Sequence, residues 1–297
     1  LVKELEPGLN ALFGLEYKRY ENQHAEIYTV ESSDRAFEEE VMLSGFANAE
    51  VKAEGSGVSF DEAQETYTAR YTHDTIALAF AITEEAIEDN LYDRLASRYT
   101  KALARSMSNA KQVKAVTPLN NGLSSVATFK AGDTVSLFST NHTTVSGTAV
   151  KNTLTTQADL NETSLEQALI DISAMTDERG LRVAARGVKM IIPSANQFNA
   201  ERLMKSQGRT GTADNDINAV ASMGMVPQGY RVNNFLTDTD SWYIITDVPN
   251  GMKMFQRAAL KTAMEGDFDT GNVRYKARER YSFGVSDYRG IFGVEGA

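Results

Sequence analysis

Three histidines, His24, His73 and His142, are the first residues to examine for chemistry, because imidazole serves both as a general base and as a zinc ligand. They lie far apart in the sequence, no His-x-x-x-His spacing occurs, and the chain has no cysteine. Each is therefore expected to be structural. His142 lies in the polar segment 139–144 (STNHTT), where it would need a neighbouring nucleophile that the sequence does not identify.

Other catalytic and binding motifs are incomplete. Neither a Gly-x-x-x-x-Gly-Lys-Ser/Thr loop nor a Gly-x-Gly-x-x-Gly turn after an expected strand is present, which argues against nucleotide chemistry. Ser286 follows Gly284 by two residues, but Tyr288 stands where a nucleophile elbow needs glycine. Residues 266–272 (GDFDTGN) resemble a calcium loop whose glycine and closing glutamate are misplaced. The sequence therefore predicts no catalytic residue, no cofactor and no bound metal.

Positive charges alternate along residues 271–284 (GNVRYKARERYSFG). The alternate positions hold Arg274, Lys276, Arg278 and Arg280, which we call the basic column. Successive strand side chains point to opposite faces, so these cations are expected on one face and apolar residues on the other, with Glu279 as the exception. Such a column often only faces solvent or discourages edge pairing. The alternative is that it meets carboxylates, within the chain or on a neighbouring copy.

Candidate carboxylates for that pairing lie near the start of the chain. They are Glu38, Glu39, Glu40, Asp61, Glu62 and Glu65. Residues 1–40 are expected to be an arm with a short amphipathic helix over Leu9 to Tyr20 and little core of its own. Residues 41–75 are expected to form a long hairpin with a Gly/Ser-rich turn at residues 54–59. Such a hairpin is marginal alone in water, so it needs another body to lie on.

The rest of the chain alternates between helical and extended patterns. The clearest helix is predicted from Thr83, a good N-cap, to Val116, with Pro118 closing it. A second helix is predicted to open with a capping box of Thr163 and Glu166 and to stop at Gly180. Further elements are a strand at 187–193, a helix from Ser194 to Lys205, a polar loop at 207–216, and strands at 230–232 and 242–246. This succession predicts an α+β fold with a mixed sheet flanked by helices.

Composition excludes some classes of function. The longest apolar run, residues 76–82, is far shorter than the roughly 20 residues that cross a bilayer, so no membrane partner is expected. Lysine and arginine total 30 against 40 for aspartate and glutamate, a net charge of -10, which argues against nonspecific nucleic-acid binding by the whole molecule.

Several stretches together resemble the major capsid proteins of tailed double-stranded DNA bacteriophages, most closely the group of the Mu-like prophage major head subunit. They are residues 80–107 (FAITEEAIEDNLYDRLASRYTKALARSM), 137–149 (LFSTNHTTVSGTA), 154–181, 189–206 (KMIIPSANQFNAERLMKS), 211–220 and 277–293 (ARERYSFGVSDYRGIFG). The resemblance covers roughly residues 60–297 in consistent order. The arm matches only in position and character.

The resemblance implies a particular organisation. Residues 1–40 would be the N-terminal arm and 41–75 the extended hairpin loop. Residues 76–118 and 251–284 would form a peripheral domain with a long spine helix, and residues 119–250 and 285–297 an axial domain with a central mixed sheet.

The resemblance also implies a function. The chain would be a structural protein of the virion, made in the cytoplasm of the bacterial host, whose hexamers and pentamers build an icosahedral head around DNA, with scaffold, portal and decoration proteins as possible partners. The basic column would then meet carboxylates of an adjacent arm or hairpin. Some relatives crosslink a hairpin lysine to an asparagine; Lys52 lies in the right region, but no partner is identified, so no crosslink is expected.

Two other interpretations remain. An encapsulin-like shell uses related subunits to enclose protein cargo, although this polar arm shows no obvious apolar groove for docking cargo. A hydrolase that uses His142 with nearby hydroxyls is disfavoured, because no partner constellation is visible.

Overall fold

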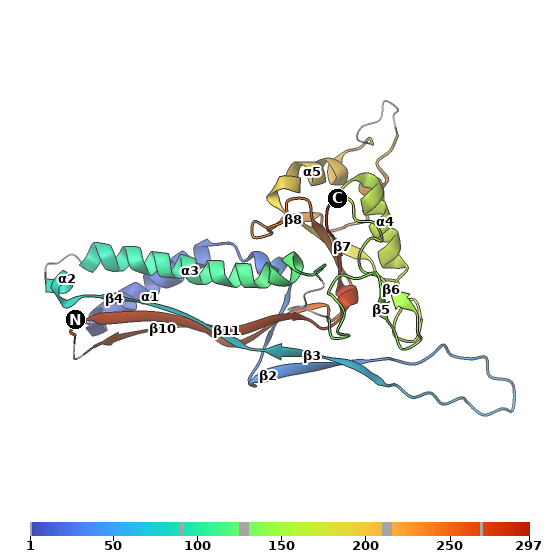
Figure 1. The fold of residues 1–297 in the computed structure, drawn as a ribbon, viewed down its shortest axis with the longest axis horizontal. Helices are drawn as coiled ribbons and strands as arrows, with labels where there is room; N and C mark the ends of the chain where they lie inside the picture. Colours follow the sequence, from blue (N-terminus) through green and yellow to red (C-terminus); the bar gives the residue numbers. More distant parts are fainter. Residues whose placement is uncertain (1, 89–91, 125–130, 210–215, 268–269) are drawn as a thin grey trace.

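The computed structural model describes residues 1–297 apart from residues 1, 89–91, 125–130, 210–215 and 268–269. An elongated part built from long strands and a long helix joins a second part with shorter elements, and a hairpin projects from their junction (Figure 1). We call these the peripheral part, the axial part and the hairpin. The expected α+β fold is confirmed.

A four-stranded sheet forms the base of the peripheral part. Its strands, in order across the sheet, are β1 (Thr29–Ser32), β10 (Met252–Gly266), β11 (Val273–Val285) and β4 (Asp74–Ile82). β1 runs parallel to β10, and the other neighbours are antiparallel. The expected long helix is α3 (Tyr92–Asn120), which follows the short α2 (Glu84–Glu88) and lies along one face of this sheet (Figure 1).

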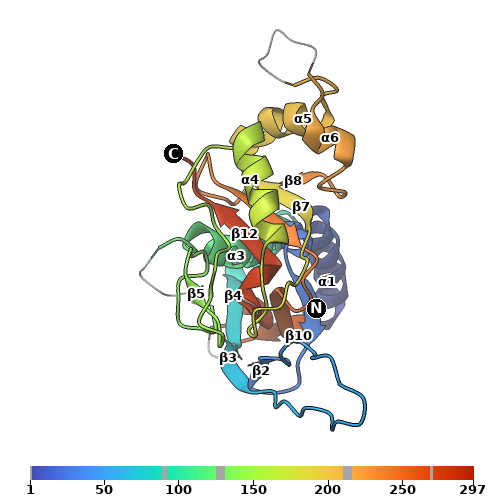
Figure 2. The ribbon, with the colours of Figure 1, turned by 90° about the vertical axis from the view of Figure 1, so that its right-hand side faces the viewer.

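A second four-stranded sheet forms the centre of the axial part. Its strands, in order, are β12 (Ile291–Val294), β9 (Trp242–Thr246), β7 (Gly187–Ile192) and β8 (Tyr230–Val232). Only β7 and β8 pair in parallel, so the expected mixed sheet is confirmed. Figure 2 shows α4 (Glu162–Ser173) over this sheet, where Leu165, Leu169 and Ile172 join one core with Met190 and Ile244.

Short elements complete the axial part. They are β5 (His142–Thr143), β6 (Ala149–Val150), η2 (Ser194–Asn196), α5 (Gln197–Lys205), α6 (Ala219–Met223) and η3 (Tyr288–Gly290). The strands predicted at 230–232 and 242–246 and the helix predicted from Ser194 to Lys205 are confirmed. Most of the predicted polar loop at 207–216 lies outside the described residues, although Gly208 forms a bridge with Ile217.

Four predicted helix boundaries are wrong. The arm helix, α1 (Val2–Arg19), begins seven residues before the predicted Leu9. Pro118 lies inside α3, because a proline near the end of a helix removes one donor without stopping the two residues after it. The capping box of α4 is formed by Asn161 and Ser164, whose backbone amides each donate to the other's side chain at 3.0 and 2.9 Å. Asparagine is the stronger N-cap, so Thr163 falls inside the helix. α4 ends at Ser173, well before Gly180.

The hairpin consists of β2 (Phe37–Leu43) and β3 (Glu65–Thr72), paired antiparallel as expected, and β3 leads almost directly into β4. Residues 44–64 between the two strands form neither helix nor strand and reach away from the body (Figure 1). The exposed large apolar residues of this segment are Phe46, Val51, Val58 and Phe60. The segment therefore presents apolar surface that its own subunit does not cover.

The N-terminal arm, unlike the hairpin, packs on its own subunit. Residues 2–32 form α1 (Val2–Arg19), η1 (Gln23–Glu26) and β1, and they pack on their own subunit. Leu9 and Phe13 are buried against α3 and the sheet, and Tyr28 is buried with its hydroxyl donating to the carbonyl of Ala115 at 2.6 Å. Residues 1–40 were expected to be an arm with little core, and residues 2–32 instead share the core of their own subunit. Its apolar residues, spaced four apart at 9, 13 and 17, form a stripe that a helix can bury.

A buried ion pair lies where α1, α3 and β11 meet. Lys111 Nζ of α3 is 2.5 Å from Glu279 Oε2 of β11, and it also donates to the hydroxyl of Tyr17 of α1 at 2.9 Å. Glu279 is the residue that interrupts the apolar face of β11, and its side chain is fully buried. Burial raises the pKa of Glu279, while the positive charge of Lys111 opposes this shift. Lys111 is therefore needed to stabilise the carboxylate.

Removing the lysine tests this dependence. We expect Lys111→Met to lower the free energy of unfolding by about 3 to 5 kcal/mol, because it leaves a buried carboxylate without its counter-charge. Urea unfolding followed by circular dichroism measures the effect. Lys101→Met, on the exposed side of the same helix, is the matched control and should change stability by less than about 0.5 kcal/mol. Equal effects of the two variants would contradict the proposed role of the pair.

His24 of η1 gives the arm a dependence on pH. Its backbone amide donates to Gln112 Oε1 at 2.9 Å, and its Nδ1 lies 3.0 Å from Gln112 Nε2, which donates to an unprotonated nitrogen. Burial, and secondarily the charge of Lys111, lowers the pKa of His24 from 6.5 to about 4. Between these values the unfolded chain binds a proton that the folded chain does not, so stability falls as the pH drops through this range.

This linkage predicts a measurable difference between wild type and His24→Gln. On lowering the pH from 7 to 4.5, the wild type should lose about 2 to 3 kcal/mol more unfolding free energy than the variant, whose residue 24 does not titrate. Urea unfolding at both pH values gives the comparison, and the other titrating groups cancel because both proteins carry them. Identical losses would show that His24 is not held neutral in the folded protein.

Candidate inter-subunit surface

The basic column lies on the outer face of the peripheral sheet, opposite the helices. Val273, Tyr275, Ala277 and Tyr281 are buried on the inner face of β11, whereas Arg274, Lys276 and Arg278 are exposed and Arg280 is half-buried. The predicted alternation of the two faces is therefore confirmed. The column forms one row of positive charge along a 13-residue strand.

The side chains that flank the basic column on the neighbouring strands are mostly small. On β4, three of the cations face alanines. Arg274 pairs with Ala81, Lys276 with Ala79 and Arg278 with Ala77. On β10, Ala263 pairs with Lys276 and Lys261 pairs with Arg278. Paired residues share a face of the sheet, so small side chains flank much of the basic column, while Glu265 of β10 lies opposite Arg274.

Most of this charge is not neutralised within the subunit. Arg274 forms an ion pair with Asp267, but Lys276, Arg278 and Arg280 have no ion pair among the described residues. The Arg280 Nε atom is buried without a hydrogen-bond partner in that part of the chain. Arg280 also acts on His73, because burial first and then the charge of Arg280 lower the pKa of that histidine.

The three consecutive glutamates lie on β2 at the base of the hairpin. Glu38 accepts a hydrogen bond from the Ser33 hydroxyl at 2.6 Å, and Glu39 lies 3.7 Å from Arg70 of β3. Glu40 turns inward, where it pairs with the buried Lys253. Only Glu39 of the three is exposed.

The other candidates lie on the return segment of the hairpin. Asp61 accepts hydrogen bonds from the backbone amides of Ala47 and Glu62, at 2.7 and 2.9 Å, and these bonds lower its pKa. Arg179 of the axial part lies 3.3 Å from Asp61 and donates to the Glu62 carbonyl at 2.6 Å. Glu65, at the start of β3, is exposed. No ion pair joins any of the six candidate carboxylates to the basic column within the described subunit.

A buried ionic cluster at the junction was missed by the sequence analysis. Arg289 is 2% exposed and donates to Glu178 at 2.6 Å, to Asp287 at 3.2 Å and to the carbonyl of Thr176 at 2.8 Å. Nearby, Tyr71 of the hairpin lies 2.5 Å from the hydroxyl of Ser286. The contact of Tyr71 with Ser286 joins the hairpin to the axial part beside this cluster. Only the short Asp287 to Arg289 spacing could have suggested the cluster, because Glu178 is distant in sequence.

The structure places neither His142 nor Ser286 in a catalytic arrangement. His142 is completely buried, its Nδ1 lies 2.6 Å from Asp133 and its Nε2 lies 3.1 Å from Asn152 Oδ1. Both ring nitrogens are thus occupied by structural partners. Ser286 contacts Tyr71 and Glu40. The hydrolase interpretation therefore has no support in the geometry of these residues.

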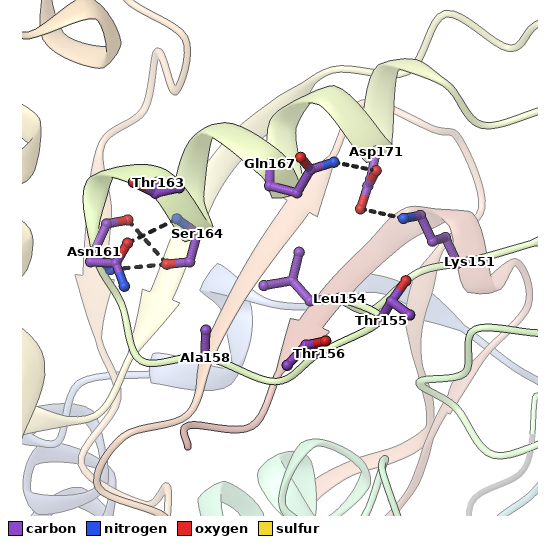
Figure 3. Close-up of a pocket in the computed structure, with 10 residues that line it drawn as sticks. All are labelled: Lys151, Leu154, Thr155, Thr156, Ala158, Asn161, Thr163, Ser164, Gln167 and Asp171. Atoms are coloured by element: carbon purple, nitrogen blue, oxygen red, sulfur yellow. Dashed lines mark hydrogen bonds and ion pairs between the residues drawn. The ribbon is translucent and has the colours of Figure 1, made fainter.

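A pocket of about 480 Å³ lies between α4 and the segment that leads into it (Figure 3). Its polar groups bind each other, since Lys151 pairs with Asp171 at 2.8 Å and Gln167 donates to the same carboxylate at 2.9 Å. Asn161 and Ser164 at its other end form the helix cap. These side chains stabilise α4, and none of them is arranged for catalysis.

Metal ligands and membrane spans were also sought. Within the described ranges, no group of three or more His, Asp or Glu residues could hold a metal ion. Asp269, part of the calcium-like segment, lies outside those ranges, and Asp267 pairs with Arg274. Of the helices in the described part of the chain, none is long and apolar enough to cross a membrane.

A profile of the family described as phage capsid protein matches residues 66–294. The chain belongs to the phage capsid protein family. It is a structural protein of the virion, and the predicted function of a major capsid protein is confirmed. A search of the curated proteins finds no match.

Solved capsid structures share the fold of this capsid protein. The virus-like particle from Pyrococcus furiosus matches with a TM-score of 0.57 at 11% identity, over 97% of this chain and 98% of that chain. The capsid of Myoviridae phage XM1 matches with a TM-score of 0.54 at 11% identity, over 91% and 90%. The capsid of a native GTA particle gives 0.54 at 13% identity, over 94% and 92%. The similarity extends over nearly the whole chain in each case.

The contact between Arg179 and the hairpin predicts a local effect. Arg179→Ala removes the donor to the Glu62 carbonyl and the charge beside Asp61, so residues 44–64 should be cut faster by protease, and global stability should change by less than about 1 kcal/mol. Limited proteolysis with mass spectrometry locates the cuts. Arg186→Ala, at an exposed arginine of the axial part, is the control. Unchanged cleavage would show that Arg179 does not restrain the hairpin.

Proposed function

We propose that hexamers and pentamers of this major capsid protein form an icosahedral shell around double-stranded DNA. The observation that carries the proposal is the hairpin, whose residues 44–64 extend away from the body with Phe46, Val51 and Phe60 in solvent. Apolar groups on a projecting segment are costly to leave in water. Contact with further copies buries them.

The basic column is proposed as the surface that receives carboxylates from an adjacent copy. Its charge is largely unpaired within the described subunit, and the chain as a whole is acidic, so other copies offer complementary charge. Glu62 and Glu65 are the best placed of the six candidates, because both are exposed on the hairpin and neither forms an ion pair among the described residues, whereas Glu39 lies beside Arg70. Glu40 and Asp61 already bind groups of their own subunit.

Each of these pairs would contribute little alone. Exposed ion pairs are worth roughly 0 to 1 kcal/mol, so the strength of a shell must come from burial of the hairpin and from the number of contacts that each subunit makes. The ion pairs would mainly select the register of neighbouring copies.

The net charge of -10 is consistent with DNA as the enclosed content. Weak repulsion between an acidic protein and phosphates keeps packaged DNA from adhering to the wall. We propose scaffold, portal and decoration proteins as further partners, and the Mu-like prophage head subunits as the nearest group. The division into arm, hairpin loop, peripheral and axial domains is likewise proposed. An encapsulin-like shell is the alternative, and nucleic-acid content of purified particles distinguishes the two.

Charge reversal tests the proposed surface. The double variant Arg278→Glu with Arg280→Glu should remain helical as a subunit and yet form no closed particles, because like charges would face each other at the interface. Circular dichroism, sedimentation and electron microscopy measure folding and assembly.

The matched control is Lys101→Glu with Arg105→Glu, which makes the same charge change on the exposed side of α3. This control should still assemble. Normal particles from the Arg278/Arg280 variant would refute the proposed role of the column, and wild-type protein that never forms particles would refute the proposed function itself.

A further inference from the structure

His142 of β5 is completely buried, and both of its ring nitrogens face oxygen atoms. Nδ1 lies 2.6 Å from Asp133 Oδ2, and Nε2 lies 3.1 Å from Asn152 Oδ1. A neutral imidazole carries one proton, so it donates from one nitrogen and accepts at the other. The charge of His142 therefore depends on whether either of these oxygens can donate a hydrogen bond.

The orientation of the Asn152 side chain is fixed by its other partners. Its Nδ2 donates to the carbonyls of Leu137, Tyr288 and Ile291 at 2.8, 3.1 and 3.4 Å, and its Oδ1 accepts from the amide of Ser139 at 2.9 Å. A reversed side-chain amide would place its NH₂ group against that backbone N–H and its oxygen against three carbonyl oxygens. The atom that faces His142 is therefore an acceptor.

The carboxylate of Asp133 is the acceptor on the other side of the ring. Its Oδ1 accepts from the amide of Val135 at 3.2 Å, and an ionised carboxylate has no proton to donate. Nδ1 of His142 must then donate to Asp133 while Nε2 donates to Asn152. Both hydrogen bonds form only when the ring carries two protons and a positive charge.

The charged groups around the imidazole favour a second proton on it. The ring stacks on Tyr288 with 3.9 Å between the ring centroids and 8° between the planes, an arrangement that stabilises a cation. Arg289 also lies over the ring of Tyr288, at 4.4 Å, and its charge alone would oppose a second cation. Glu178 and Asp287 both pair with Arg289 and neutralise it. Asp133 remains as the counter-charge of the imidazolium.

The loop that contains Asp133 has a strained backbone. Thr134 has a φ of 67°, a left-handed value that β-branched residues rarely adopt. Gly132 lies against the ring of Tyr67 of β3, so closely that a Cβ atom would not fit between them. The contact between Asp133 and His142 joins this loop to the interior of the axial part. Loss of that contact would relieve the strain and move the loop away from the base of the hairpin.

We propose that His142 is doubly protonated at neutral pH, that its charge holds residues 131–138 against the axial part, and that alkaline pH releases this loop. When a base in the solvent removes one proton, a bare nitrogen faces an oxygen of Asp133 or of Asn152, and the two lone pairs repel each other. The folded subunit binds the extra proton, so the contact is formed at neutral pH and is lost as the pH rises. This inference concerns the single subunit and does not depend on the proposed shell.

Nuclear magnetic resonance of the ring nitrogens tests the charge directly. The intact chain labelled with ¹⁵N-histidine contains only three such residues, and His24→Gln and His73→Gln identify the signals of the other two. At pH 7 we expect both nitrogens of His142 to give the chemical shift of a protonated nitrogen. His24, whose pKa is lowered to about 4, should keep one bare nitrogen and serves as the internal reference. A bare nitrogen on His142 at pH 7 overturns the proposal.

Asp133→Asn keeps the shape of the contact and removes its charge. The new side-chain amide can donate to Nδ1, so His142 should become neutral at pH 7 while the loop stays in place. Asp247→Asn is the matched control, because Asp247 accepts from the amide of Arg186 elsewhere in the axial part, and it should leave His142 doubly protonated. A second proton that persists in Asp133→Asn, or that is lost in both variants, contradicts the assignment.

Cleavage by chymotrypsin measures the release of the loop. The enzyme cuts after Phe138, which is 2% exposed, and after Phe60, which is 94% exposed, so the ratio of the two cuts in one sample cancels the effect of pH on the enzyme. From pH 7 to the pH at which His142 has lost a proton, this ratio should rise several-fold in the wild type and stay constant in Asp133→Asn. A constant ratio in the wild type, or an equal rise in both proteins, overturns the proposal.

Discussion

The register of β11 is the constraint on which the rest of this subunit depends. Its side chains alternate between a buried apolar face and an exposed basic face, and a shift of one residue would exchange them. Four cations would then be buried against α3. Pairing on both sides holds the register, with Ala277 opposite Leu78 on β4 and Thr262 on β10. The one charge on the buried face, Glu279, is stabilised only because Lys111 of α3 lies beside it.

The same constraint determines which surfaces other copies can contact. Because α1 and α3 cover the inner face of the sheet, the outer face and the edge of β4 stay open. The hairpin extends from the sheet through β3 and β4, so its position follows from the sheet as well. The subunit therefore presents a basic face, an uncovered edge and an apolar projection as parts of one framework.

Sequence patterns predicted the elements better than their partners. The strands at 230–232 and 242–246 and the alternation along β11 followed from short apolar runs and a period of two, which are local properties. The amphipathic stripe of α1 was visible too, but a stripe does not say which surface buries it. An arm with little core was predicted, but α1 buries its stripe on its own subunit.

The contacts that join the parts were beyond prediction for the same reason. Lys111 and Glu279, or Arg289 and Glu178, are distant in sequence, and neither pair shows in any local pattern. The carboxylates of the hairpin show the same limit of sequence-based prediction. Their charge was evident, but Glu40 and Asp61 bind groups of their own subunit, which only the fold reveals.

The division of the front of the chain into a docked arm and a projecting hairpin has a physical consequence for assembly. The docked arm contributes its apolar burial to the stability of the subunit before any copy is met. In the hairpin, the exposed apolar residues are spread over the irregular segment 44–64. No single one of them therefore offers enough apolar surface area to bind strongly. Contacts that are weak one at a time can be broken and made again, and they become strong only when a closed shell engages many of them at once.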